Sequence, residues 1–502
     1  MEYSHPLVAE NQEAAEVDRI SIETYGVASV ALMETAGSKT ADWLINHTTS
    51  GDVIGIVCGK GNNGGDALVC ARQIHASGRK VGVHMVMGDN QLSPDAQVNY
   101  DILQTISKES GNITFYENLH ELIQTNPVWW VDGIFGTGLS SEVREPVATA
   151  IQEINQHPSP TLALDVPSGL DGTRGKVLGT TISAHTTLMY GMGKLGAFIN
   201  DGPDYCGNRL IIPLGFTGPA LDKVSRRLIE SEPVVKQPEV GSGFSHKYEA
   251  GIVYLFAGSD GMTGAAVMAA KAAWSYGAGG VVIFCPAGLL QIYEQLLPEA
   301  VKIPLGASSD TWFKPEHLDS ALEKIKKRHP HVILAGPGTG NRHETLDFFT
   351  LLLEKYDGKL IFDADAFSVF GENIPRRPDS QQLIATPHRG EFTKVRSPET
   401  HDDYSLLIES EQFAGQNKLS LLLKGEPSIV TNSNETLITA YPTHYYNRFG
   451  FGDVLAGMIA AGFLHKNELN ACASAMVTGN MRLQKVISKK TGRPPRPFDL
   501  II

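Results

Sequence analysis

Short apolar runs alternate with helical patterns over the first 215 residues of the chain. Continuous apolar runs that end in glycine, proline or an acid predict buried strands. These runs are DVIGIVC (52–58), KVGVHMVM (80–87), NITFYE (112–117), VWWVDGIFGTG (128–138), TLALDVPSG (161–169), TTLMYGM (186–192) and RLIIPLG (209–215). Helical patterns lie between them, including one that ends near Gly78 and one over 142–156. This alternation predicts a mostly parallel sheet with helices on both faces.

Residues 216–247 interrupt the alternation. The segment is polar, contains proline and glycine, and shows little periodicity. Such a stretch between two patterned regions is typical of a linker. We therefore expect two domains, comprising residues 1–222 and 223–502.

A second alternating series follows the linker. Its apolar runs are GIVYLFAGS (251–259), GVVIFCP (280–286), VILAGPG (332–338), LIFDADAF (360–367), QLIATPHRGE (382–391) and LSLLLKG (419–425). A small-residue helix is expected over 263–276, a hairpin over 428–441, and two closing helices from Gly452 and near Glu468. Because the two halves do not share a motif order, we expect two different α/β domains rather than a duplication.

Composition narrows the class of protein. The chain has 502 residues, of which 42% are hydrophobic, and a formal net charge of −13 without a long basic run. Nucleic acid and anionic membranes are therefore not expected as partners. The five cysteines are scattered without a C-x-x-C pair, which favours a reducing compartment. The N-terminal residues lack a signal-peptide pattern, and no apolar run approaches the roughly 18 residues of a membrane span. We expect a cytoplasmic globular protein.

Three unusual loops of the first half all follow predicted strands. They are GKGNNGGD (59–66), DGIFGTGLSSE (132–142) and DVPSGLDG (165–172). Ligands of parallel α/β sheets bind beyond the carboxyl ends of the strands, so these loops are expected to converge on one site. Glycines let a backbone approach a ligand closely, and a helix N-terminus offers free N–H groups to an anion. Asn63, Asp132 and Ser168 are hard oxygen donors suited to a small hard cation.

Two other interpretations of these loops are open. Gly59-x-Gly61-x-x-Gly64 has the spacing of a dehydrogenase turn, but the acid expected about 20 residues later is represented only by Asp89, after a glycine in a turn. Each loop taken singly also fits an ordinary turn or helix start. The convergence of all three favours a ligand site.

The three motifs together resemble the epimerase domain of the NAD(P)H-hydrate repair enzymes, over most of residues 10–215. The resemblance implies a Rossmann-like three-layer α/β/α domain that interconverts the R and S hydrates of NADH and NADPH, which carry water at nicotinamide C6. It implies Asp165 as the catalytic acid/base and potassium at Asn63, Asp132 and Ser168. The residues that it implies for holding the hydrate are Asn62, Asn63, Gly64, Gly65, Asp66, Gly136, Thr137, Gly138, Leu139, Ser140, Ser141, Glu142 and Asp165.

The second half has its own set of strand-end loops. Gly450-x-Gly452-Asp453 opens an apolar helix, where exposed N–H groups can stabilise a migrating phosphoryl group. Asp453 is placed to take a hydroxyl proton as that oxygen attacks phosphorus, and Lys424 to reach a nucleotide phosphate. Structural alternatives are a helix cap for Asp453, a solvated end charge for Lys424 and a surface turn for His388.

This half resembles the ribokinase-like fold and, within it, the ADP- or ATP-dependent NAD(P)H-hydrate dehydratases, over about residues 230–490. The motifs that carry the resemblance are AGSDGMTGAA, GPGTG, DADAF, TPHRGE and GFGDVLAG. It implies phosphorylation of the S-hydrate hydroxyl by a nucleotide, followed by loss of phosphate, with Asp453 as base. The hydrate contacts implied are Ala265, Gly338, His388 and Asp453. The nucleotide contacts implied are Lys424, Gly425, Glu426, Pro427, Ser428 and Gly452.

Several features depart from that pattern, including Ser428 in place of a threonine, VTGNMRLQ (477–484) on the last helix, and three larger changes. Arg389 replaces a usual proline, Phe451 replaces a small residue or methionine, and YPTHYYNRFG (441–450) replaces a loop rich in glycine and proline. A bulky Phe451 is expected to narrow the phosphate site, and Arg389 to add an anion contact. These departures keep a second class open, in which a degenerate dehydratase half only binds nucleotide or builds an oligomer.

The sequence as a whole predicts a two-domain metabolite-repair enzyme. Its expected substrates are the hydrates of NADH and NADPH and an adenine nucleotide, ADP or ATP. Potassium is expected at the first site, Mg²⁺ is compatible with the second, and the resemblance favours a homo-oligomer. The alternative within enzymes is a ribokinase-type kinase that phosphorylates a small alcohol stably.

Overall fold

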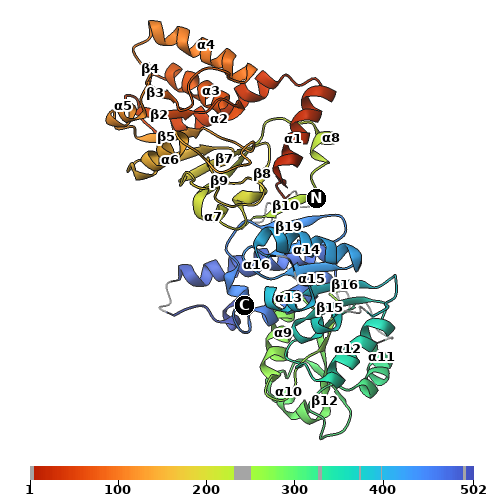
Figure 1. The fold of residues 1–502 in the computed structure, drawn as a ribbon. Helices are drawn as coiled ribbons and strands as arrows, with labels where there is room; N and C mark the ends of the chain where they lie inside the picture. The colour runs from red at the N-terminus through yellow and green to blue at the C-terminus, as the bar shows by residue number, and fades with distance from the viewer. Residues whose placement is uncertain are drawn as a thin grey trace. The chain divides into compact units, whose positions relative to one another are not determined.

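The chain forms two compact units, one over Pro6–Arg226 and the other from Arg227 onward. The structure is a computed structural model, and it describes residues 5–230, 250–325, 331–371, 375–396, 398, 400–489 and 493–501. The linker predicted over 216–247 therefore lies outside the described residues from position 231, and its described part instead forms a short helix over Gly218–Leu221 and a strand over Arg226–Ile229. Figure 1 shows the elements of each unit, which are described separately below.

The first unit is built on a seven-stranded sheet in the order β4-β3-β2-β5-β6-β7-β9, in which all neighbours run parallel. The strands are β2 (Val53–Cys58), β3 (Lys80–Met85), β4 (Ile113–Phe115), β5 (Trp129–Gly133), β6 (Thr161–Leu164), β7 (Thr186–Tyr190) and β9 (Asn208–Ile212). Every strand coincides with a predicted apolar run. A separate parallel pair joins β1 (Val8–Ala9) to β8 (Gly193–Lys194).

Helices cover both faces of this sheet (Figure 1). They are α1 (Asn11–Arg19), α2 (Ser29–His47), α3 (Asn62–Ala76), α4 (Pro94–Glu109), α5 (Leu119–Gln124), α6 (Val147–Gln156), α7 (Gly202–Tyr205) and α8 (Gly218–Leu221). Ile54 and Ile56 of β2 pack in one cluster with residues of α2 and α3, whereas Val57 packs with α6. Alternate residues of a strand face opposite sides, so the sheet buries both faces and the domain has three layers.

The second unit contains a ten-stranded sheet in the order β10-β19-β18-β17-β16-β15-β14-β11-β12-β13. Its strands are β10 (Arg226–Ile229), β11 (Ile252–Phe256), β12 (Gly280–Pro286), β13 (Val301–Leu305), β14 (His331–Ala335), β15 (Lys359–Asp363), β16 (Gln382–Thr386), β17 (Ser420–Leu423), β18 (Ile429–Thr431) and β19 (Thr436–Thr439). The neighbours from β13 to β17 are parallel, and β17, β18 and β19 are antiparallel. The predicted hairpin is the β18–β19 pair, whose turn is held by Asn432 Oδ1 accepting from Asn434 N and Glu435 N.

Helices also flank the second sheet. They are α9 (Thr263–Ser275), α10 (Leu290–Leu296), α11 (Leu318–Ile325), α12 (His343–Lys355), α13 (Arg389–Val395), α14 (Asp403–Gln416), α15 (Phe451–Phe463) and α16 (Glu468–Ser488). Val253 and Leu255 of β11 share a core with α9, α15 and α16. Phe256 of the same strand instead stacks on Phe284 and contacts Phe348 of α12. Both units are thus α/β structures with largely parallel sheets, which confirms the predicted fold class.

Candidate functional sites

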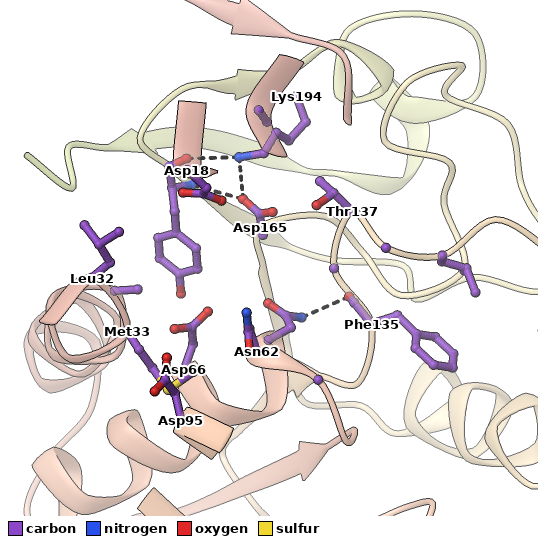
Figure 2. A pocket seen from close by; sticks show the side chains of 18 of the residues that line it. Asp18, Leu32, Met33, Asn62, Asp66, Asp95, Phe135, Thr137, Asp165 and Lys194 are labelled. Carbon is purple, nitrogen blue, oxygen red and sulfur yellow. Dashed lines mark hydrogen bonds and ion pairs between the residues drawn. The ribbon is translucent and has the colours of Figure 1, made fainter. Parts of the chain in front are cut away.

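A cavity of about 620 Å³ lies within the first unit, at the carboxyl ends of β2, β5 and β6. Figure 2 shows side chains from all three predicted loops pointing into it. The predicted residues that line it are Asn62, Asn63, Asp66, Gly136, Thr137, Gly138, Leu139, Ser140, Ser141 and Asp165. The convergence expected from the parallel topology is therefore present in the fold.

Three residues expected to hold the hydrate lie elsewhere. Gly64 and Gly65 are buried in the first turns of α3, and a Cβ on Gly64 would lie 2.1 Å from the carbonyl oxygen of Gly59. A Cβ on Gly65 would overlap the Met33 side chain. Glu142 is exposed and is not among the residues that line the cavity. The two glycines therefore serve the close packing of α3 rather than the cavity wall.

Asp165 is fixed at the cavity wall by a buried cation. Its carboxylate lies 2.6 Å from Nζ of Lys194, a side chain that is only 3% exposed. Lys194 also donates to the carbonyl oxygens of Tyr190 (3.0 Å) and Met192 (3.3 Å). Asp165 has a φ of 65°, in the left-handed region that non-glycine residues rarely adopt. The buried ammonium thus orients the carboxylate toward the cavity.

Two further carboxyl groups face the same cavity. Burial raises the pKa of Asp66 well above its ordinary value, and the neighbouring carboxylates of Asp165 and Asp18 add to the rise. Burial also raises the pKa of Asp18 to about 6, although its exposed position at the cavity lets water moderate this effect. The cavity thus contains carboxyl groups with different proton affinities.

An oxygen-rich cluster lies below the loop that follows β5. Asp132 is buried and accepts from the Ser168 hydroxyl (2.5 Å) and the Ser168 backbone N–H (2.8 Å). The Asn63 side-chain amide donates to the carbonyl oxygen of Phe135 (2.9 Å), whereas its Oδ1 is buried without a partner. Burial raises the pKa of Asp132 to about 6, while its hydrogen bonds with Ser168 oppose the rise. The structure brings the three predicted cation ligands together and leaves one buried acceptor free.

Sequence reasoning missed several residues of the first cavity, and three of them carry polar groups used below. Lys194, Asp18 and Tyr190 all line it, yet none belongs to the three loop motifs. Lys194 follows the apolar run 186–192 as a lone charge, which was its only sequence signal. Its position depends on β8 pairing with β1, a contact between residues far apart in the chain.

A buried ion pair lies at the centre of the strand ends in the second unit. Lys424 Nζ is 2.8 Å from Asp363 Oδ1, and the two side chains are 6% and 2% exposed. Thr386 also donates to Asp363 (2.7 Å). Burial acts to lower the pKa of Lys424, but Asp363 and Glu391 outweigh it, so the pKa is raised and the lysine stays charged. Asp363 belongs to the DADAF motif and was not chosen as a site residue from the sequence.

Asp453 occupies the first turn of α15, beside this ion pair. Gly450 caps the helix with a φ of 83°, and a Cβ on Gly452 would lie 3.4 Å from Lys424 Nζ. Burial and the Asp363 carboxylate raise the pKa of Asp453 to about 6. The predicted base, lysine and glycine turn therefore adjoin one another.

The remaining predicted residues of the second half are Ala265, Gly338 and His388, together with the loop over 424–428. Ala265 and Gly338 are in contact, since a Cβ on Gly338 would lie 2.8 Å from that of Ala265. His388 caps α13 by accepting from Glu391 N (3.1 Å), and its side chain is 51% exposed.

The 424–428 loop follows β17. Ser428 is buried and donates to the Gly425 carbonyl oxygen (2.9 Å), which holds the turn in which Glu426 is exposed.

The structure revises what we expected of Phe451 and Arg389, two residues that differ from the usual dehydratase sequence. Phe451 is 2% exposed and packs in the core with Tyr446, so it does not narrow the phosphate site. Arg389 forms an ion pair with Asp403 (2.7 Å) and donates to the Glu426 carbonyl oxygen (2.6 Å). The arginine therefore braces the 424–428 loop against α14.

Two searches of the described residues gave negative results. Within them, no group of three or more histidine, cysteine, aspartate or glutamate side chains could hold a metal ion. None of the helices described is both long and apolar enough to cross a membrane.

The chain matches two family profiles in succession. Residues 29–196 match the YjeF-related protein N-terminus, and residues 253–494 match NAD(P)H-hydrate dehydratase. The bifunctional NAD(P)H-hydrate repair enzyme of Salinibacter ruber is 30% identical over 93% of this chain and 90% of its own length. The enzyme of the same name from Coxiella burnetii is 29% identical, over 93% of this chain and 92% of its own.

Two solved structures are each similar to about half of the chain. The ADP/ATP-dependent NAD(P)H-hydrate dehydratase of Bacillus subtilis covers 53% of this chain and 91% of its own, with 22% identity and a TM-score of 0.45. A ribokinase-like superfamily protein of Enterococcus faecalis covers 55% and 93%, with 18% identity and a TM-score of 0.44.

The two α/β domains, each with acids and glycine turns at its strand ends, define a fused pair of small-molecule enzyme domains. Because relatives match both halves in the same order over nearly their full length, the kinship covers the whole chain. The chain belongs to the family of bifunctional NAD(P)H-hydrate repair enzymes, which confirms the family predicted from the motifs.

Proposed function

We propose that the first domain interconverts the R and S hydrates of NADH and NADPH, and that the second dehydrates the S hydrate with an adenine nucleotide. The observation that carries this proposal is the cavity whose wall holds Asp165 between Asn62–Asp66 and Gly136–Ser141. A carboxylate fixed by Lys194 can exchange a proton with the C6 hydroxyl of a bound hydrate.

In the first domain, potassium would be held by Asn63, Asp132 and Ser168. The unpartnered Asn63 Oδ1 and the carboxylate and hydroxyl beside it supply the oxygen donors that such a cation prefers. The bound cation would supply a fixed positive charge below the Gly136–Ser141 loop. The chain itself holds this loop through Asn11, whose side chain donates to the Thr137 carbonyl oxygen (2.9 Å).

In the second domain, Asp453 would take the proton from the C6 hydroxyl as its oxygen attacks the terminal phosphorus of the nucleotide. The P–O bond to the leaving nucleotide breaks, giving AMP from ADP or ADP from ATP. The C6–O bond then breaks and C5 loses a proton, which releases phosphate and restores the ring double bond. Lys424 and the α15 N-terminus are placed to offset the phosphate charge, and Mg²⁺ is expected to accompany the nucleotide.

Two remaining features belong to the same proposal. Family resemblance supports a homo-oligomer. A cytoplasmic location is supported by the composition and by five buried, unpaired cysteines.

The proposal is tested by incubating the full chain with mixed R and S NADH hydrate and either ADP or ATP. We expect the absorbance of reduced nicotinamide to return, with release of free phosphate. No conversion with either nucleotide would refute the function. Phosphorylation of a small alcohol without phosphate release would instead identify a ribokinase-type kinase.

A second candidate, a degenerate dehydratase half that only binds nucleotide, is favoured by one observation. Phe449, in the divergent 441–450 loop beside Gly450, is fully exposed. Calorimetric titration of ADP together with turnover assays separates the two. Nucleotide binding without any turnover of the S hydrate would favour the degenerate domain.

A further inference from the structure

Two carboxyl groups in unlike environments face the first cavity from different elements. Asp165 follows β6 and is paired with the buried ammonium of Lys194. Asp66 extends from the first turns of α3, and Figure 2 shows it pointing into the same space. Within the described part of the chain, no hydrogen bond or ion pair is formed by the Asp66 side chain. Two carboxyl groups in environments that differ in this way are the arrangement used in general acid–base catalysis.

The groups around Asp66 favour its protonated form. Asp18 of α1 and Asp165 add negative charge, and Asp95 of α4 lines the same cavity. Lys194, a cation that acts to lower the pKa of Asp66, donates its hydrogen bonds to Asp165 and to two carbonyl oxygens. The Tyr190 hydroxyl is engaged with Thr40 at 2.7 Å. Burial and these carboxylates together raise the pKa of Asp66 well above its ordinary value, which favours the protonated carboxyl that can donate.

We propose that Asp66 is the second acid–base group of the epimerase site and acts on the face of the nicotinamide ring opposite Asp165. This inference rests on the proposed function of the first domain. It assigns protonation of the leaving hydroxyl on one face to Asp66, and uptake of the proton from the attacking water on the other face to Asp165.

The proposed step balances as follows. Asp66 gives its proton to the C6 hydroxyl of one epimer, the C6–O bond breaks, and the lone pair of N1 forms a double bond to C6 as water leaves. A second water attacks C6 from the other face and its proton passes to Asp165, while the N1–C6 double-bond pair returns to N1. The product is the other epimer, with Asp66 ionised and Asp165 protonated. This state is the one needed for the reverse reaction, and solvent resets it.

Oxygen exchange tests the C–O cleavage in the unmodified chain. In water enriched in ¹⁸O, each interconversion should place one solvent oxygen on C6, measured by mass spectrometry after separating the epimers and subtracting an enzyme-free control. Interconversion without incorporation of ¹⁸O would overturn the proposal. This experiment requires no variant, so a folding defect cannot obscure it.

Asp66→Asn tests the residue itself. General acid–base catalysis contributes about 10²–10⁴-fold, so we expect catalysed interconversion to fall at least about 100-fold. Asp66→Glu keeps a carboxyl group and should therefore retain part of the interconversion rate. The alkaline limb of its pH–rate profile should shift relative to that of the unmodified chain. Asp42→Asn, an exposed change on α2 outside the cavity lining, is the matched control and should interconvert the epimers normally.

The outcomes separate this inference from the function on which it rests. If the unmodified chain fails to interconvert the epimers, the proposed function is wrong. If the unmodified chain is active and both Asp66 variants keep its rate and pH profile, only the role of Asp66 is wrong. Nucleotide-dependent loss of the S hydrate should persist in Asp66→Asn, which reports that the chain is intact.

Discussion

At the scale of single residues, the first site depends on the pairing of Asp165 with Lys194. The lysine is almost fully buried and has three acceptors, of which Asp165 is the only charged one. Removing one partner of such a pair leaves the other charge uncompensated. The position of the Asp165 carboxylate therefore depends on a residue outside the loop motifs.

Replacing Lys194 with methionine should disable the base. Without the ammonium, the Asp165 carboxylate loses the ion pair that holds it in place at the cavity wall. We expect R/S interconversion to fall by roughly tenfold or more, because a misplaced catalytic group loses its productive geometry. Lys39→Met, which changes an exposed lysine, is the control. Interconversion at the full rate in Lys194→Met would contradict this account.

The second site makes a pH prediction through Asp453. Its pKa of about 6 lies above the ordinary value, and the base must be ionised to accept a proton. The rate of phosphate release should therefore fall as pH decreases through 6, by about tenfold per pH unit below it. Asp453→Asn should abolish this release at every pH.

The same group affects stability with a definite sign. A carboxyl whose pKa is raised on folding binds more protons in the folded state, so stability decreases as pH rises from about 3.8 to about 6. Asp453→Asn should raise Tm at pH 7.5 and lose this advantage near pH 4. An equal change in Tm between Asp453→Asn and the unmodified chain at both pH values would show that burial does not raise the pKa of this carboxyl.

Residues of the sites were predictable from sequence where loops carry them. Asn63, Asp132, Asp165 and Ser168 lie in glycine-rich motifs at strand ends, and parallel topology requires these motifs to converge. Lys194 and Asp18 were not predictable, because their positions depend on β8 pairing with β1 and on how α1 packs. Periodicity contains no information about such long-range contacts.

At the scale of elements, the loop that follows β17 is braced by the helix that follows β16. The Arg389 guanidinium on α13 donates to the Glu426 carbonyl oxygen and also forms an ion pair with Asp403 of α14. A Cβ on Gly425 would overlap the Arg389 side chain, so the two segments are in close contact. The predicted nucleotide loop thus depends on an arginine in place of the usual proline.

Replacing Arg389 with alanine should loosen this loop and weaken nucleotide binding. We expect the Kd for ADP to rise about tenfold, equivalent to roughly 1.4 kcal/mol, when measured by calorimetry. Arg396→Ala, at the other end of α13, removes an arginine that pairs with Glu409 and is the matched control. A Kd for ADP that is equal in the two variants would remove Arg389 from this role.

Elements were predictable where their apolar pattern is continuous. The edge strand β13 was missed because its sequence, VKIPL, includes a lysine and a proline and is only partly buried. The helix expected over 142–156 begins at Val147, because Pro146 occupies its N-cap. Interior strands can be predicted from their apolar sequences, whereas edge strands and the first residues of helices depend on tertiary contacts.

At the scale of the whole molecule, the chain combines two domains with separate cores and separate sites. Each site has its own acids, and no described residue is shared between them. The two proposed activities should therefore be lost independently, with Asp165→Asn affecting only the first and Asp453→Asn only the second.

The most direct test supplies pure R NADH hydrate and ADP or ATP to the full chain and follows both epimers and reduced nicotinamide with time. The unmodified chain should convert all of the R hydrate to NADH, Asp453→Asn should accumulate a mixture of R and S hydrates, and Asp165→Asn should leave R hydrate to its spontaneous rate. R hydrate that persists in the unmodified chain with either nucleotide, or that Asp165→Asn consumes at the full rate, would contradict the account.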